Sequence, residues 1–222
     1  TSWTAGIEDY INPLIGLCDR TELNAMVIDV KDATGYVAYQ PDVAMVREMK
    51  LWEKRIPDVE ALMERLREHG IFPIARIVCF NDPLLAQKAP QLAVQHKDGG
   101  LWKDRYGASY TNPYNREVWE YLVQVAEDAV RRGFREIQFD YVRFPTDGII
   151  ADAGIAKLYR GAVDVALQQA IGYDGPGFPS LAPFGQGGDI VALRQVVTEA
   201  VSYTHLRAHE TPAHLVCRLL LQ

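Results

Sequence analysis

IQFDYVRFP, residues 137–145, leads from an apolar strand into an acid, two aromatic residues, an arginine and a proline. Ile137 and Phe139 are typical of a buried strand, whereas Asp140 and Arg143 are charges that such a strand carries only with partners or for a functional purpose. Where strands and helices alternate, charges at the C-terminal ends of the strands build active sites. We therefore predict that the chemistry of this chain takes place around Asp140.

The rest of the sequence predicts an α/β fold. Nearly continuous apolar runs predict three strands, at residues 25–30, 72–80 and 136–142. Apolar residues at helical spacing predict three helices, at residues 9–20, 59–66 and 115–132. Because the strands are apolar along their whole length and alternate with helices, the sheet is expected to be parallel and covered by helices.

The connections between these elements are unequal in length. Helix-to-strand links such as 69–71 are tight, whereas the strand-to-helix links, at 31–57 and 81–113, are long. Long loops therefore lie at the C-terminal ends of the strands, which is the pattern of a barrel enzyme with an elaborated top face. Within the second loop, Asp98-Gly99 predicts a hairpin turn that holds Trp102 above this face.

Four charged residues are expected to meet inside the barrel. Alternation along the strands places Asp29 and Lys31 on one side of the first strand, with Arg76 and Asp140 on the corresponding sides of the next two. Such neighbours favour ionised carboxylates, and an ionised Asp140 suits a nucleophile or a base rather than a proton donor. The alternative is a buried ion-pair network, because barrel interiors are filled in layers.

Further candidates for substrate binding share a position in a loop or at a strand end. They are Trp3, Asp82, Trp102, Tyr114, Tyr141 and Arg143. The tryptophans and Tyr114 could stack on sugar rings through their apolar faces. Asp82 is followed by turn-forming sequence, as is Asp32, so capping a loop is the commoner role for an acid at either position.

Composition excludes several classes of partner. The 222 residues carry a formal net charge of -6, and no cluster of Lys and Arg marks a surface for nucleic acid, so a neutral or cationic partner fits better. No apolar run approaches the length of a membrane span. The three cysteines are widely spaced and predict neither a disulfide framework nor a zinc site.

The C-terminal segment, residues 201–222, holds three of the five histidines. His205, His209 and His214 have the spacing of metal ligands on a helix. However, VSYTHLRAHET and LVCRLLL within this segment resemble the translation of a transposon-type sequencing adapter. We therefore interpret residues 201–222 as a non-native tail, and we expect neither a metal site nor a cofactor.

Five blocks of sequence then point to a family. They are NAMVIDVKDATGYVAY, GIFPIARIVCFNDPLLAQ, DGGLWKDR, NPYNREVWEY and GFREIQFDYVRFPTDG. Together, over about residues 1–148, they resemble a bacterial family of glycoside hydrolases, TIM-barrel domains long catalogued without a known function. The resemblance implies a carbohydrate substrate and an extracytoplasmic or cell-envelope setting. It also implies a partial (β/α)8 TIM barrel truncated at both ends, with residues 1–200 forming an incomplete domain.

The leading hypothesis is a glycoside hydrolase acting on a polysaccharide or a cell-envelope glycan. Asp140 would be the nucleophile or the stabilising carboxylate. Asp29 would be the second catalytic residue, and together with Lys31 and Arg76 it would orient Asp140 and bind hydroxyls. Cleavage also needs a proton donor, expected on a strand outside this chain, so the chain alone is expected to be weak or inactive. The alternatives are a carbohydrate-binding barrel without turnover, and a Schiff-base lyase using Lys31.

Overall fold

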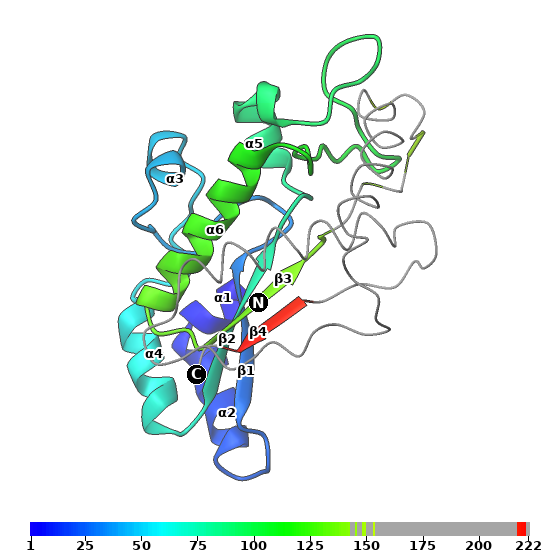
Figure 1. Ribbon diagram of the computed structural model, residues 1–222. Coiled ribbons are helices and arrows are strands. Elements are labelled where there is room, and N and C mark those ends of the chain that lie inside the picture. Colours follow the sequence, from blue (N-terminus) through cyan, green and yellow to red (C-terminus); the bar gives the residue numbers. More distant parts are fainter. Residues whose placement is uncertain (143–144, 146–147, 150–152, 154–216, 221–222) are drawn as a thin grey trace, which may run out of the picture.

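The computed structural model describes residues 1–142, 145, 148, 149, 153 and 217–220. Its sheet has the order β1 (Ala25–Lys31), β2 (Phe72–Val78), β3 (Glu136–Asp140) and β4 (Cys217–Leu220). The first three strands are parallel, at the positions and in the orientation predicted from the sequence. The protein is therefore a mixed α/β structure built on a parallel sheet, as Figure 1 shows.

Helices connect and cover the parallel strands. They are α1 (Ser2–Gly6), α2 (Glu8–Cys18), α3 (Ala44–Glu48), α4 (Val59–Glu68), α5 (Pro83–Lys88) and α6 (Arg116–Arg131), with a 3-10 turn at Pro90–Leu92. The predicted helices correspond to α2, α4 and α6. In Figure 1, α4 and α6 lie on the same side of the sheet, where both contact β2. Among the described residues, no helix combines the length and apolarity needed to cross a bilayer.

The core lies between the sheet and the long helices. Val118, Leu122 and Val125 recur at helical spacing on α6 and are fully buried against the sheet. They meet Ala75 and Ile77, the residues of β2 that point to the helical side. Arg76, between these two, points to the other face. Because side chains alternate along β2, Ala75 and Ile77 face the helices, whereas the charged Arg76 faces the opposite side of the sheet.

β4 departs from the parallel pattern. Cys217–Leu220 pairs antiparallel with β3 at the edge of the sheet. It lies within residues 201–222, whose assignment as a non-native tail remains a prediction. The histidines of that segment, His205, His209 and His214, lie outside the described residues.

Asp128 joins α6 to the loop that follows β1. Its side chain is 1% exposed, accepts the backbone N–H of Asp42 at 2.9 Å, and pairs with Arg131 and Arg132 at 3.3 and 3.5 Å. Because a buried hydrogen bond to a charged group is lost, Asp128→Ala should lower the free energy of unfolding by about 1.5–3 kcal/mol. Urea denaturation would measure this loss.

Glu64→Ala is the matched control for that measurement. Glu64 is also a helical acid paired with an arginine, Arg67, but both side chains are exposed, so little stability should be lost. Equal midpoints for the Asp128 and Glu64 variants would show that Asp128 does not secure the loop.

Candidate active site

Asp29, Arg76 and Asp140 come together on the face of the sheet opposite the helical core. Arg76 Nη1 donates to Asp29 Oδ1 at 2.6 Å. On its other side, Nε and Nη2 both donate to Asp140 Oδ2, at 2.8 and 2.5 Å. Three neighbouring strands therefore contribute one charged side chain each to a single cluster, which we call the Arg76 centre.

The carboxylate of Asp140 is fixed from two directions. Arg76 holds Oδ2, and the backbone N–H of Tyr141 donates to Oδ1 at 2.7 Å. Tyr141 has a φ of 53°, in the left-handed region, which costs a residue other than glycine about 1–2 kcal/mol. Strain of this kind at the end of a strand is a recurring property of functional sites. It is also the local feature that ends β3 and presents Asp140 at the rim.

The Arg76 centre carries a formal net charge of -1. Burial alone would lower the pKa of the Arg76 guanidinium, but its hydrogen bonds to Asp29 and Asp140 outweigh burial and raise the pKa above its ordinary value. Arg76 therefore stays protonated wherever the protein is folded. Two carboxylates around one fixed cation leave one excess negative charge at the C-terminal ends of the strands. This arrangement can stabilise a positive charge that develops beside it.

Lys31 does not join the Arg76 centre. Asp29 pairs with Arg76 across the sheet, but a β-bulge then shifts the register so that Lys31 pairs with Ile77. Because paired residues point to the same face, the bulge turns Lys31 away from Arg76. The predicted meeting of all four charged residues was therefore wrong for Lys31.

Lys31 instead forms a buried ion pair with Asp82. The two side chains are both 0% exposed, with Lys31 Nζ 3.0 Å from Asp82 Oδ2. Lys31 Nζ also donates to the carbonyl oxygen of Val78 at 2.6 Å. Asp82 Oδ1 accepts the N–H of Leu85 at 2.9 Å and so caps the helix α5, where the sequence predicted a loop cap or a contact with substrate. Neither side chain has exposed surface with which to contact a substrate.

The predicted aromatic candidates lie in different surroundings. Trp3 on α1 is 49% exposed, whereas Tyr114 and Tyr141 are partly buried. Tyr114 packs against a small second core that contains Trp102 and Tyr110. Arg143 lies outside the described residues.

Trp102 is buried rather than presented above the sheet. The hairpin predicted at Asp98-Gly99 is present, with Trp102 N–H bonded to the carbonyl oxygen of Val94 at 2.9 Å. However, Trp102 is 1% exposed, and its indole N–H donates to the carbonyl oxygen of Ile149 at 3.1 Å. The prediction that it is available for stacking was wrong, because the hairpin packs against a later segment that local sequence could not reveal.

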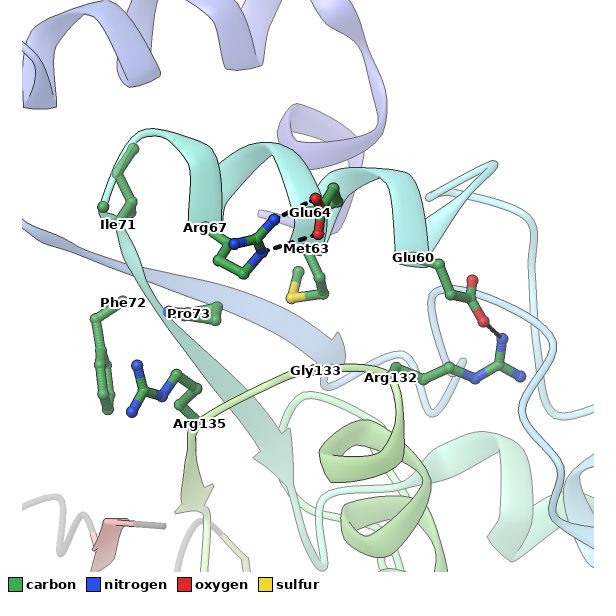
Figure 2. Close-up of a pocket in the computed structure, with 11 residues that line it drawn as sticks. Glu60, Met63, Glu64, Arg67, Ile71, Phe72, Pro73, Arg132, Gly133 and Arg135 are labelled. Atoms are coloured by element: carbon green, nitrogen blue, oxygen red, sulfur yellow. Dashed lines mark hydrogen bonds and ion pairs between the residues drawn. The ribbon is translucent and has the colours of Figure 1, made fainter. Parts of the chain in front are cut away.

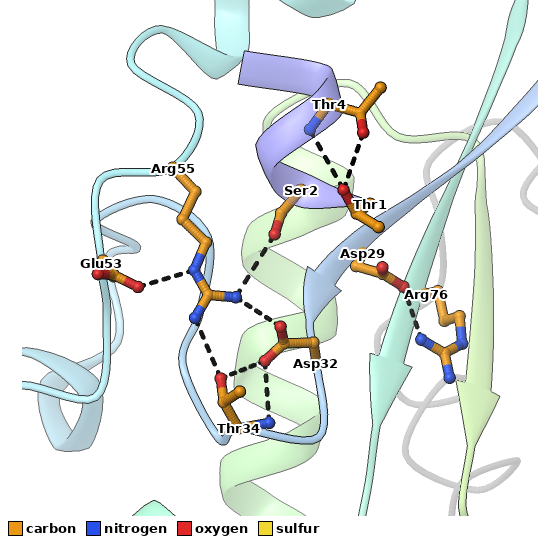
Figure 3. Close-up of polar contacts among 9 residues, drawn as sticks. All are labelled: Thr1, Ser2, Thr4, Asp29, Asp32, Thr34, Glu53, Arg55 and Arg76. Carbon is orange, nitrogen blue, oxygen red and sulfur yellow. Dashed lines mark hydrogen bonds and ion pairs between the residues drawn. The ribbon is translucent and has the colours of Figure 1, made fainter. Parts of the chain in front are cut away.

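Sequence reasoning missed Arg55, which lies 5% exposed in the loop after β1. Figure 3 shows its guanidinium bonded to Asp32, Thr34, Glu53 and Ser2. A charge in a long loop without periodicity carries no local signal of burial. The available hint was Asp32, an acid directly after a strand and therefore at the same rim as the other strand ends.

The Asp32 carboxyl stays ionised in this arrangement. Burial raises its pKa, but hydrogen bonds from Thr34 and Arg55, with the charge of Arg55, outweigh burial and lower the pKa below its ordinary 3.8. The stability contributed by the Asp32–Arg55 ion pair is therefore fully present at pH values above 3.8, the ordinary pKa of the Asp32 carboxyl. It is lost only as the pH falls through the lower pKa of the folded state.

A hollow of about 530 Å³ lies at the other end of the strands. Figure 2 shows Phe72 and Pro73, at the start of β2, among its lining residues. Its arginines are engaged: Arg67 with Glu64, and Arg135 over the ring of Phe72 at 5.3 Å. Because the N-terminal face of such a sheet serves stability rather than catalysis, we place the candidate site at the Arg76 centre instead. Nowhere in the described part of the chain do three or more potential metal ligands cluster.

Comparison with known proteins supplies a family. The model of a family described as "Putative glycosyl hydrolase domain" matches residues 1–164. A crystal structure of a hypothetical protein from Ruminiclostridium thermocellum ATCC 27405 is 31% identical, has a TM-score of 0.66, and matches over 96% of this chain and 92% of that one. The α-galactosidase from Lactobacillus brevis is 12% identical, with a TM-score of 0.48, over 90% of this chain and 22% of that chain. No curated protein matches the chain.

Proposed function

Because the chain belongs to the family described as "Putative glycosyl hydrolase domain", we propose that it cleaves glycosidic bonds in a polysaccharide or a cell-envelope glycan. The observation that carries this proposal is the carboxylate of Asp140. It ends β3, is 8% exposed, and has hydrogen-bond donors fixed on both of its oxygens. Such a group is preorganised to act on a reacting atom at the C-terminal ends of the strands.

Asp140 acts as the nucleophile or as the stabilising carboxylate in this proposal. Glycoside cleavage passes through an oxocarbenium-like transition state, in which positive charge develops at the anomeric centre. The excess negative charge of the Arg76 centre stabilises that charge, and Arg76 keeps Asp140 in place. Asp29 holds Arg76 from the neighbouring strand and thereby acts on Asp140 through the guanidinium.

The complete mechanism needs a proton donor as well. A second carboxyl group, roughly 5–10 Å from the first, usually protonates the leaving oxygen. We propose that this donor lies outside the described residues, on another strand of a (β/α)8 TIM barrel. The parallel order of β1, β2 and β3 with helical crossovers supports such a barrel.

The proposal also covers domain organisation and location. We propose that residues 1–200 form one barrel domain and that residues 201–222, which follow the end of the family match at residue 164, are a tail whose strand β4 pairs with its edge. An envelope glycan lies outside the cytoplasm, so an extracytoplasmic or cell-envelope location fits such a substrate. A Schiff-base lyase is disfavoured, because Lys31 is fully buried and paired with Asp82.

Release of reducing ends tests the proposed hydrolysis. The full chain is incubated at high concentration with soluble starch, xylan, carboxymethylcellulose and purified peptidoglycan, and new reducing ends are counted over time. We expect slow release from at least one polymer, in proportion to protein concentration, because the chain alone is predicted to be weakly active. Oligosaccharide binding by calorimetry without any release would contradict hydrolysis and favour the carbohydrate-binding barrel.

A further inference from the structure

Trp3 lies with its indole ring against a buried cation. The guanidinium carbon of Arg55 is 5.5 Å from the centre of the Trp3 ring and 5.6 Å from the centre of the Tyr36 ring. Trp3 is nevertheless 49% exposed, so its contact with Arg55 leaves surface of the residue open to solvent. A large aromatic residue is therefore presented to solvent beside a guanidinium that supports it.

The support is held by charged and polar partners. Arg55 donates to Asp32 at 2.5 Å, to Glu53 at 2.8 Å and to Thr34 at 3.1 Å, with Ser2 Oγ at 3.5 Å. A guanidinium bonded in several directions cannot rotate away from the ring it supports. The partners come from α1, from the turn after β1 and from the loop that carries Arg55, so the network joins three segments at one point.

The backbone of α1 is docked directly on Arg55. A Cβ atom placed on Gly6 would lie 1.7 Å from the carbonyl oxygen of Arg55. Any residue with a Cβ would clash there, so the close approach requires glycine. The position of Trp3 relative to Arg55 is thus set by backbone contact as well as by side chains. This close approach is an observation independent of the cation–ring contact.

Trp3 with its supporting residue Arg55, which together we call the Trp3 platform, lies at the same end of the sheet as the Arg76 centre. Asp32 directly follows β1, and Asp140 ends β3, which runs parallel to β1. Figure 3 shows the Arg55 network beside the end of β1, with the Asp29–Arg76 pair on the neighbouring part of the strands. A glycan that reaches Asp140 could therefore extend across this rim.

We propose that Trp3, backed by Arg55, is a carbohydrate subsite on which a sugar ring of a neutral or cationic glycan stacks. Arg55 is a positioning residue: it contacts no sugar but holds the indole ring so that little freedom is lost on binding. The inference rests on the proposed function, because it assigns part of the glycan to this rim. The net charge of -6 disfavours an anionic glycan.

Calorimetric titration of the full chain tests the subsite. The probes are maltohexaose, cellohexaose and the hexasaccharide of glucosamine. Trp3→Ala should weaken binding of the best probe by about tenfold or more, because a sugar-stacking surface is lost. Tyr10→Ala is the matched control, since Tyr10 is 60% exposed on α2, and it should bind as the unaltered protein does. Equal affinity of the Trp3 and Tyr10 variants would overturn the subsite but leave hydrolysis at Asp140 standing.

The positioning role is tested by Gly6→Ala. The added methyl group must displace α1 from Arg55, so binding should weaken several-fold. Acrylamide should also quench more strongly the emission of Trp3, measured as the part of the signal of the four tryptophans that Trp3→Ala removes. Gly16→Ala is the control, because its Cβ would meet only the flexible end of Arg20, at 3.1 Å. Unchanged binding and quenching in Gly6→Ala would overturn the role of Arg55. If the unaltered protein binds no probe and releases no reducing ends, the proposed function itself fails together with the subsite.

Discussion

Replacing Asp140 by asparagine is expected to lower the rate of glycan hydrolysis by about 10³-fold or more, the scale on which loss of a catalytic group acts. Asparagine has the same shape, and its amide oxygen can still accept the N–H of Tyr141. However, it carries no negative charge to stabilise an oxocarbenium ion and is too weak a nucleophile to attack one. Glycan binding should change little, because asparagine keeps the shape of the side chain.

Asp58→Asn is a suitable control for this experiment. Asp58 caps α4 by accepting the N–H of Ala61 at 2.8 Å, and asparagine caps helices as well as aspartate does. The control should therefore hydrolyse glycans at the unaltered rate. Full turnover by Asp140→Asn would remove Asp140 from the mechanism.

Asp140→Ala in the presence of azide separates the two roles proposed for this carboxylate. If Asp140 is the nucleophile, azide can enter the vacated space and attack the anomeric carbon as the leaving group departs, which forms a glycosyl azide. Recovery of activity together with that product identifies a nucleophile. Absence of recovery, with the rate still low, identifies a carboxylate that acts through its charge. Asp29→Asn should have a smaller effect than either change, because Asp29 acts through Arg76.

The strands and long helices could be predicted because their signals are local. The apolar residues Ile74, Ala75 and Ile77 lie on both faces of β2, so a few residues of sequence predict that both faces are buried. In the same way, the spacing of Val118 and Leu122 predicts the buried side of α6. One further local signal was overlooked. Asp82 followed by Pro83 is the start signature of a helix, and it begins α5.

The errors share a different physical origin. Strict alternation placed Lys31 beside Asp29, but one extra residue in a β-bulge reverses the direction of every later side chain in the strand. Trp102 is buried by a segment that follows it by almost fifty positions, and Arg55 by α1, which precedes it by about as many. Contacts of that range leave no trace in local composition. They are formed in the loops, whereas the Arg76 centre is built from residues of the strands themselves.

Lys31→Met should be the most destabilising of the substitutions considered. Removing one member of a fully buried ion pair leaves the other charge without compensation, which typically costs about 3–5 kcal/mol of the free energy of unfolding. Asp82 would be that uncompensated charge, since it is 0% exposed at the N-terminal cap of α5. The loop after β1 packs closely on Asp82, because a Cβ on Gly35 would lie 2.3 Å from Asp82 Oδ1 and only glycine fits there. Urea denaturation measures the loss.

The double variant Lys31→Met/Asp82→Asn shows whether the pair itself is responsible. Asparagine keeps the cap on Leu85 but removes the stranded charge, so the double variant should be more stable than Lys31→Met alone. Simple addition of the two single effects would contradict a coupled pair. Hydrolysis per folded molecule should survive in both variants, because the bulge has turned Lys31 to the side of the sheet opposite Asp140. A loss of kcat without a loss of stability would instead indicate that Lys31 acts in the active site. Urea denaturation and the hydrolysis rate together therefore separate a structural role of Lys31 from a chemical one.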